Sequence, residues 1–333
     1  MQPIIECIPN FSEGQNQEVV DQIAAAIRGV EGVKLMHIDM GYSANRTVMT
    51  FAGTPDRVIE AAFRGIKEAS ERIDMSAQSG THPRMGATDV CPLVPIQGIP
   101  FDALLPYAEQ LGHRVGDELG IPVYFYEKSA LISERHNLAF IRKGGYEGFQ
   151  TKILQAKWKP DAGPQHFHSR AGQTVIGVRD FLIAYNINLD TKDTSLAKDI
   201  AGEIRESGKT IQKNGVKQRI AGTCKGVKAI GWYVDEFGLV QVSTNVTDIE
   251  TTPVHRVFEE VKKEANKRGV EVRGSEVIGM IPKKVLIAAG KYYGKQENPS
   301  EESLIREAID QLGLSEFDLF DPYQKILEYQ LKL

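Results

Sequence analysis

Apolar residues in the first third of the chain alternate between strand-like and helix-like spacing. Residues 3–9 form a short apolar run typical of a strand, and apolar side chains then recur at helical spacing over residues 20–30. Residues 33–40 and 47–51 are rich in β-branched and apolar side chains, which predicts two further strands separated by a turn. The pattern therefore begins as strand, helix, strand, strand.

A second helix and strand follow this beginning. Thr54, Pro55 and Asp56 are suited to the first positions of a helix, because they can cap it, fix its first φ angle and favour its positive end. Residues 90–96 predict the next strand, residues 101–119 a helix and residues 122–126 another strand. The order β-α-β-β-α-β is that of a ferredoxin-like fold.

The alternation of helix-like and strand-like apolar spacing stops between about residues 146 and 174 and then begins again. Residues 174–188 form a long β-prone run, and elements of the same kinds follow it. We predict an α/β (α+β) fold with two ferredoxin-like βαββαβ-type subdomains, residues 1–178 and 179–333. In the second subdomain the expected elements are a helix over residues 195–207, a hairpin over 227–234 and 239–246, a helix over 252–269, a strand over 270–281, and appended helices from residue 300.

Composition narrows the class of protein. Of 333 residues, 41% are hydrophobic and 25% charged, which is ordinary for a globular protein and excludes a disordered chain, a collagen-like fibre or a disulfide miniprotein. The net charge of -4 lacks the basic excess of a nucleic-acid binder, so we expect no nucleic-acid partner. Three distant cysteines without CxxC spacing favour a reducing compartment and argue against a structural zinc site.

Targeting and cofactor motifs are missing from the pattern. The first residues lack the basic and apolar regions of a signal peptide, and no apolar run is long enough to span a membrane, so we expect a cytoplasmic protein without a membrane partner. Neither a P-loop spacing nor a GxGxxG motif after a strand is present, so no nucleotide is expected. His166 and His168 lack a neighbouring cysteine or carboxylate, which makes a poor metal site.

Three loops in the first subdomain are dense in polar residues and lie next to predicted strands. They are residues 9–14, 39–46 and 79–89. Loops at strand ends are where α/β proteins commonly place their sites. These loops are therefore the first candidates for a site.

His82 is the candidate proton carrier of the third loop. Pro83 restricts the backbone of His82, and an imidazole titrates near neutral pH. The alternative is a histidine held only by loop hydrogen bonds. Arg84 is suited to binding a substrate carboxylate or, more ordinarily, to a surface ion pair. Asp39 is a candidate for orienting an imidazole, and Asn10 is a candidate for binding substrate. The alternative for both is a structural role, because aspartate and asparagine side chains commonly stabilise turns and helix caps.

Residues 161–172 form a fourth candidate region. The stretch is loop-like and combines Phe167, which can stack on a flat ligand, with Arg170 and two histidines that can contact an anion. A plain linker between the subdomains is the alternative interpretation.

Several stretches, taken together and in order, resemble the glutamate formimidoyltransferase (formiminotransferase) family. One such stretch would be weak evidence, but five in register over nearly the whole chain are specific. They are Glu6-Cys7-Ile8-Pro9-Asn10-Phe11-Ser12-Glu13-Gly14, Asn45-Arg46-Thr47-Val48, Gly80-Thr81-His82-Pro83-Arg84-Met85-Gly86-Ala87, Phe181-Leu182-Ile183-Ala184-Tyr185-Asn186-Ile187-Asn188 and Gly274-Ser275-Glu276-Val277-Ile278-Gly279.

The resemblance implies an activity, a fold and a set of site residues. The family transfers the formimino group of N-formimino-L-glutamate to N5 of (poly)glutamylated tetrahydrofolate in histidine degradation, giving 5-formiminotetrahydrofolate and L-glutamate, without metal or nucleotide. It implies two subdomains with a folate channel between them, a homodimer, and catalytic roles for His82 and Asp39. The implied folate-binding residues are Gly163, Pro164, Gln165, His166, Phe167, His168, Ser169, Arg170 and Gly172, of which Gln165, His166, His168 and Arg170 depart from the vertebrate pattern.

Three other functions remain open at this point. The same loops would serve a related formyl transfer from N-formylglutamate or 5-formyltetrahydrofolate, because the two donors differ only by NH and O. A non-catalytic folate-binding protein would bind folate through the same segment without proton transfer by His82. An unrelated α/β protein would require that the five matching stretches are coincidental. In vertebrates the family's domain is fused to a cyclodeaminase, for which this chain is too short, so we expect a separate cyclodeaminase to consume the product.

Overall fold

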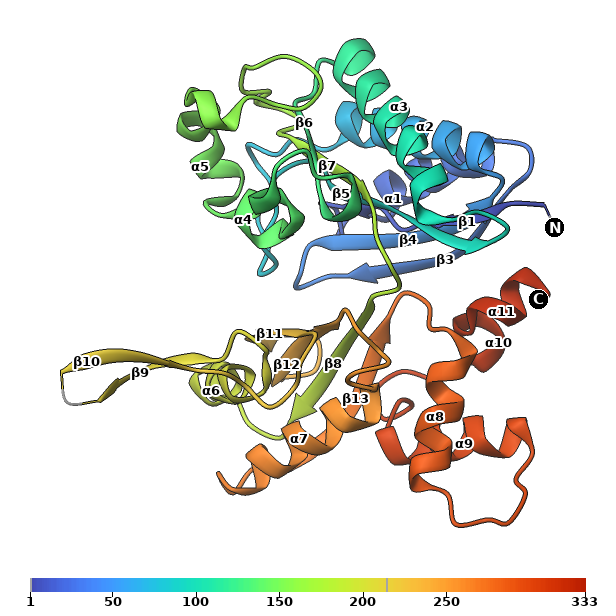
Figure 1. Ribbon diagram of the computed structural model, residues 1–333, viewed down its shortest axis with the longest axis vertical. Helices are drawn as coiled ribbons and strands as arrows, with labels where there is room; N and C mark the ends of the chain where they lie inside the picture. The colour runs from blue at the N-terminus through green and yellow to red at the C-terminus, as the bar shows by residue number, and fades with distance from the viewer. Residues whose placement is uncertain (1, 214) are drawn as a thin grey trace. The chain divides into compact units, whose positions relative to one another are not determined.

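A computed structural model describes residues 2–213 and 215–333. The chain divides into two compact units, Met1–Asp180 and Phe181–Leu333, each with its own sheet and its own apolar core (Figure 1). The mixed α/β class and the two-subdomain organisation expected from the sequence are confirmed.

The first unit is built on a seven-stranded sheet. Strands β1 (Ile4–Cys7) and β2 (Asn10–Phe11) both lie between β4 and β5, so they form one strand interrupted at Ile8 and Pro9. Together with the next three strands they give the antiparallel order β3-β4-β1/β2-β5, which is the ferredoxin-like order. The remaining strands are β3 (Val33–Gly41), β4 (Arg46–Gly53), β5 (Thr88–Gln97), β6 (Val123–Phe125) and β7 (Thr174–Val178), and the last two extend the sheet in parallel beyond β5.

Three helices cover one face of this sheet (Figure 1): α1 (Gln17–Arg28), α2 (Pro55–Arg72) and α3 (Phe101–Leu119). The side chain of Asn16 caps α1 by accepting hydrogen bonds from Glu18 N and Val19 N. Pro55 occupies the first turn of α2, as expected, but Thr54 makes no capping hydrogen bond. The apolar stripes of these helices pack on Phe11, Phe51 and other core residues of the sheet, which fixes the strand ends that carry the candidate loops.

The prediction of an irregular stretch over residues 146–174 is wrong at its start. Helix α5 (Gly145–Lys152) and a 3-10 turn at Ala156–Trp158 occupy the first part of this stretch. The short helix α4 (Leu138–Arg142) and two further 3-10 turns come before it. Tyr124, Phe149 and Trp158 pack edge to face in a small separate core beneath them. This packing holds α4 and α5 beside the end of β5 that carries the third loop.

The second unit repeats the ferredoxin-like order. Its sheet runs β11-β12-β8-β13, and α6 and α7 pack against it. The elements are β8 (Ile183–Leu189), α6 (Thr194–Ile204), β11 (Val227–Val234), β12 (Leu239–Val246), α7 (Val254–Asn266) and β13 (Val272–Ile278), followed by α8 (Lys283–Tyr293), α9 (Glu301–Leu312), α10 (Pro322–Lys325) and α11 (Leu327–Leu331).

The β-prone run 174–188 contains two strands: β7 ends at Val178 and belongs to the first sheet, whereas β8 begins at Ile183 and belongs to the second. One feature of the second half differs from the sequence expectation. An unexpected hairpin, β9 (Lys209–Lys213) with β10 (Val216–Ile220), extends away from the sheet of its own unit (Figure 1). Within the described residues, no helix has both the length and the apolar character that crossing a membrane requires.

Candidate active site

The three polar loops of the first unit lie against one another. Asn45 holds them together: its Oδ1 accepts from Gly14 N at 2.9 Å and its Nδ2 donates to Ser79 O at 2.7 Å. The backbone of Asn45 has φ of 46°, a left-handed conformation that asparagine tolerates better than most residues. Ser12 Oγ adds a bond of 2.8 Å to Gly86 O. Residues that are distant in sequence thus form one rigid surface.

A buried ion cluster lies at the centre of this surface. Asp89, at the start of β5, is fully buried, and its Oδ2 accepts from Arg46 Nη2 at 2.8 Å and from Arg142 Nη2 at 2.6 Å. Asp89 Oδ1 accepts from Met85 N at 3.0 Å. Although burial opposes ionisation, Arg142 and Arg46 hold the pKa of Asp89 below its ordinary value, so the carboxylate is charged.

His82 is partly buried and lies within the electrostatic influence of this cluster. Burial, and then the positive charges of Arg46 and Arg142, hold its pKa well below the ordinary 6.5, against the opposing effect of Asp89. His82 Nδ1 lies 2.7 Å from Pro83 O. Because a carbonyl oxygen only accepts, Nδ1 carries the hydrogen in this contact, and a neutral ring has its lone pair on Nε2.

Asn10 and Asp39 have different partners. Asn10 Oδ1 accepts from Arg46 Nε at 3.1 Å, so Asn10 extends the cluster of Arg46 and Asp89. Asp39, near the end of β3, has its Oδ2 3.5 Å from His37 Nε2. The carboxylate of Asp89 acts on His82 as well, because its negative charge raises the pKa of the imidazole against the larger lowering effects.

Arg84 forms the ion pair that was the alternative to substrate binding. Its Nη1 and Nη2 donate to the two carboxylate oxygens of Glu147 at 3.0 and 2.7 Å. Its Nε and Nη2 also donate to the side chain and backbone oxygens of Gln78. A substrate carboxylate would have to displace Glu147 to reach the bidentate face of this guanidinium.

The predicted folate segment ends directly against the third loop. Ala87 N donates to Ala171 O at 2.8 Å, and Gly86 and Gly172 form an isolated bridge. A Cβ atom on Gly86 would lie 2.1 Å from Gln173 O, and one on Gly172, whose φ is 68°, would lie 2.3 Å from Met85 O. Only glycine permits this approach of the two backbones, which places the segment beside the loop that carries His82.

The other residues of the segment differ in exposure. Phe167 is partly buried against Tyr146 and Phe149, with ring centroids 5.2 and 6.5 Å away. His168 Nδ1 accepts from Ala171 N at 3.0 Å, and burial lowers the pKa of His168. Arg170 Nη2 donates to Glu71 O. Gln165, His166, Ser169 and Arg170 are exposed, whereas Gly163 and Pro164 are partly buried.

Sequence reasoning missed Arg46, Asp89 and Arg142 as individual site residues. Asp89 carries a signal, because a charged residue directly before the apolar run 90–94 must either be exposed or have a buried partner. Arg46 belongs to a stretch quoted for the family resemblance. Arg142 carries no local signal, since its pairing with Asp89 spans 53 residues.

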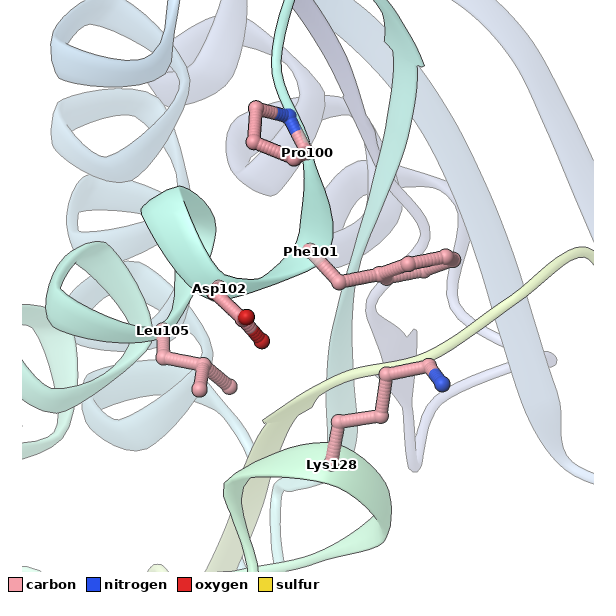
Figure 2. Close-up of a pocket in the computed structure, with 5 residues that line it drawn as sticks. All are labelled: Pro100, Phe101, Asp102, Leu105 and Lys128. Carbon is pink, nitrogen blue, oxygen red and sulfur yellow. The ribbon is translucent and has the colours of Figure 1, made fainter.

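A separate surface depression of about 430 Å³ lies at the start of α3 (Figure 2). Lys128 Nζ lies there 4.3 Å from the ring centroid of Phe101. The lining consists of Pro100, Phe101, Asp102, Leu105 and Lys128, and none of the predicted site residues is among them. Within the described residues, no three His, Cys, Asp or Glu side chains are grouped so that they could hold a metal ion.

Comparison with known families identifies the fold. The model of the "Formiminotransferase domain, N-terminal subdomain" matches residues 4–179, and that of the "Formiminotransferase domain" matches residues 184–332. The chain belongs to the formiminotransferase family. The two family stretches of the second unit lie on neighbouring strands β8 and β13, where Asn186 Nδ2 donates to Glu276 Oε1 at 2.9 Å.

Curated members of the family align over most of this chain. The glutamate formimidoyltransferase of Streptococcus pyogenes serotype M1 is 45% identical, over 90% of this chain and 95% of the relative. The glutamate formimidoyltransferase of Thermoplasma acidophilum is 40% identical, over 92% of this chain and 97% of the relative. The formimidoyltransferase-cyclodeaminase of Sus scrofa is 44% identical over 99% of this chain but only 60% of the relative. This chain therefore spans about three fifths of the length of its fused relatives.

Proposed function

We propose that this protein transfers the formimino group of N-formimino-L-glutamate to N5 of tetrahydrofolate. The names of the two relatives that align along nearly their full length support the reaction. The observation that carries the proposal is the position of His82, a histidine of lowered pKa beside a buried pair of arginines. The folate segment 163–172, which joins the same loop, is proposed to bind the co-substrate.

The proposed base is the neutral imidazole of His82. Formimino transfer begins when N5 attacks the formimino carbon, and N5 must then lose its proton. Because Nδ1–H is donated to Pro83 O, the Nε2 lone pair is the one that accepts a proton in the neutral ring. The lowered pKa keeps this ring neutral at physiological pH, which is the state a general base requires.

The same imidazole completes the reaction. After N5 adds to the formimino carbon, His82 holds the proton from N5 and the intermediate is tetrahedral. The bond between this carbon and the glutamate nitrogen then breaks, and His82 returns the proton to that nitrogen. The products are 5-formiminotetrahydrofolate and L-glutamate, and His82 is again neutral. In this scheme Asp39 assists His82 or the cationic amidine, and Asn10 orients Arg46.

Segment 163–172 supplies the surface proposed for the pterin and its glutamyl tail. Phe167 offers an aromatic face already supported by Tyr146 and Phe149. Exposed His166 and Arg170 are suited to the anionic tail, and Gly163, Pro164 and Gly172 to close backbone approach. Proton transfer by His82 accounts for the reaction, and the proposal includes no metal or nucleotide.

The proposal also covers the cellular location of the protein, its oligomeric state and the fate of its product. Cys7, Cys91 and Cys224 are buried thiols, which supports a reducing, cytoplasmic location. A homodimer is proposed from the family resemblance, and the mass of the protein in solution tests it. The product would pass to a cyclodeaminase, an activity named together with formimidoyltransferase in the fused relatives.

The reaction is tested by mixing the purified protein with tetrahydrofolate and N-formimino-L-glutamate. Acid converts 5-formiminotetrahydrofolate to methenyltetrahydrofolate, which absorbs in the near ultraviolet. We expect product with this donor and none when N-formyl-L-glutamate replaces it. Product from the formyl donor alone would make the protein a formyltransferase. Folate binding without product from either donor would indicate a non-catalytic folate-binding protein.

A further inference from the structure

Two arginines beside His82 carry hydrogen-bond donors that the protein does not use. Arg46 Nη1 and Arg142 Nε are buried, and neither has an acceptor within the described part of the chain. The Nη2 atoms of the same two guanidiniums converge on a single oxygen of Asp89, at 2.8 and 2.6 Å. One carboxylate therefore faces two positive charges, and the cluster retains a net charge of about +1.

This arrangement is unfavourable unless an anion completes it. The side chain of Arg46 is 8% exposed and that of Arg142 is 18% exposed, so water does little to solvate the surplus charge. Buried donors are normally satisfied, and unsatisfied ones in a native protein indicate either strain or a missing ligand. A ligand with acceptor oxygens and one negative charge would satisfy the unused donors and neutralise the surplus positive charge.

A carboxylate matches this requirement, and both substrates of the proposed reaction carry carboxylates. In the donor, the oxygens of the α-carboxylate are three bonds from the nitrogen that bears the formimino group. They are thus held close to the reacting centre, and the charges of the two guanidiniums act on His82. The glutamyl tail of the folate is separated from N5 by an aromatic ring. Arg84, the other candidate, already has Glu147 on its bidentate face.

We propose that Arg46 and Arg142 together bind the α-carboxylate of the one-carbon donor. The inference rests on the proposed function and adds to it the residues that recognise the donor. Binding brings the charge of the cluster to about zero and places the glutamate nitrogen near His82, which must protonate that nitrogen as it leaves. Arg46 is further held by its Nε contact with Asn10 Oδ1, which gives Asn10 a positioning role.

The test compares Arg142→Gln with Arg84→Gln. Removing Arg142 leaves Asp89 and Arg46 as a one-to-one pair, so the fold is expected to persist. We expect Arg142→Gln to raise the KM for N-formimino-L-glutamate by about 10- to 100-fold, the usual range for losing a hydrogen bond between charged groups. The KM for tetrahydrofolate should stay within twofold. Measurement at pH 8 keeps His82 neutral in both proteins. Arg84→Gln should leave both KM values nearly unchanged.

Equilibrium dialysis with L-glutamate gives a second readout that requires no turnover. The wild type and Arg84→Gln are expected to bind this product equally, and Arg142→Gln at least tenfold more weakly, with Arg142→Lys between them. An active wild type whose glutamate affinity and donor KM are unchanged by Arg142→Gln would overturn the inference and leave the proposed function intact. A rise only in the KM for tetrahydrofolate would also overturn it, because the pair would then bind the folate tail. Absence of transfer in the wild type, with glutamate binding that depends on Arg142, would instead refute the proposed function alone.

Discussion

Replacing His82 by glutamine is expected to lower kcat by about 10²- to 10⁴-fold, the contribution typical of a positioned general acid and base. Glutamine is of similar size and can still donate an N–H to Pro83 O, but it has no group that accepts a proton at neutral pH. Affinity for tetrahydrofolate should change little, because the proposed folate surface lies on segment 163–172. The measurement is kcat in the acid-conversion assay together with tetrahydrofolate affinity.

His113→Gln is the matched control for this substitution. His113 lies on α3 with its side chain 52% exposed, 3.9 Å from Glu109, and plays no part in the proposed chemistry. Its kcat should equal that of the wild type. If His82→Gln were folded and its kcat within a few-fold of the wild type, His82 would not be the base.

Asp89→Asn is expected to lower the free energy of unfolding by about 3–5 kcal/mol, the usual result of breaking a buried ion pair. Asp89 is fully buried, and the substitution leaves two guanidiniums facing a neutral amide. Because Arg142 and Arg46 hold the folded-state pKa of Asp89 below its unfolded value, although burial opposes them, this stabilisation is present above the unfolded pKa of about 3.9 and is lost as pH falls through the folded-state pKa.

Glu147→Gln provides the comparison for Asp89. Glu147 also pairs with an arginine, Arg84, but its side chain is 64% exposed, so its removal should cost about 0–1 kcal/mol. Urea unfolding of both variants at pH 7 measures the difference. A loss below about 1 kcal/mol for Asp89→Asn would show that the buried cluster does not stabilise the first unit.

Elements with strong periodicity were predictable from the sequence. The helix over residues 101–119 is α3, because its apolar stripe is regular and Gly120 ends it in a left-handed conformation. The hairpin β9–β10 was missed because those of its residues whose burial is described are mostly exposed and show no buried face. Helix α5 was missed because it is short, with glycines at 145 and 148 and a weak apolar stripe.

The candidate site was predictable only where the family resemblance or a loop pattern marked it. His82 and residues 163–172 were proposed in this way, and the bridge between Gly86 and Gly172 joins the loop of His82 to the end of that segment. The cluster of Arg46, Asp89 and Arg142 depends on long-range packing, because α4 brings Arg142 to β5 across 53 residues. The sequence indicates that Asp89 needs a buried partner, but nothing in the local sequence identifies Arg142 as that partner.

The pH dependence of kcat/KM for the wild type and His82→Gln tests the central claim most directly. A base must be unprotonated, so activity falls as pH drops through the pKa of His82, and the depressed pKa moves this fall to lower pH. We predict for the wild type an acid limb with its midpoint below 6.5, and no such limb in His82→Gln. A wild-type midpoint above 6.5, or the same limb in both proteins, would contradict the assignment of a neutral His82 as the base.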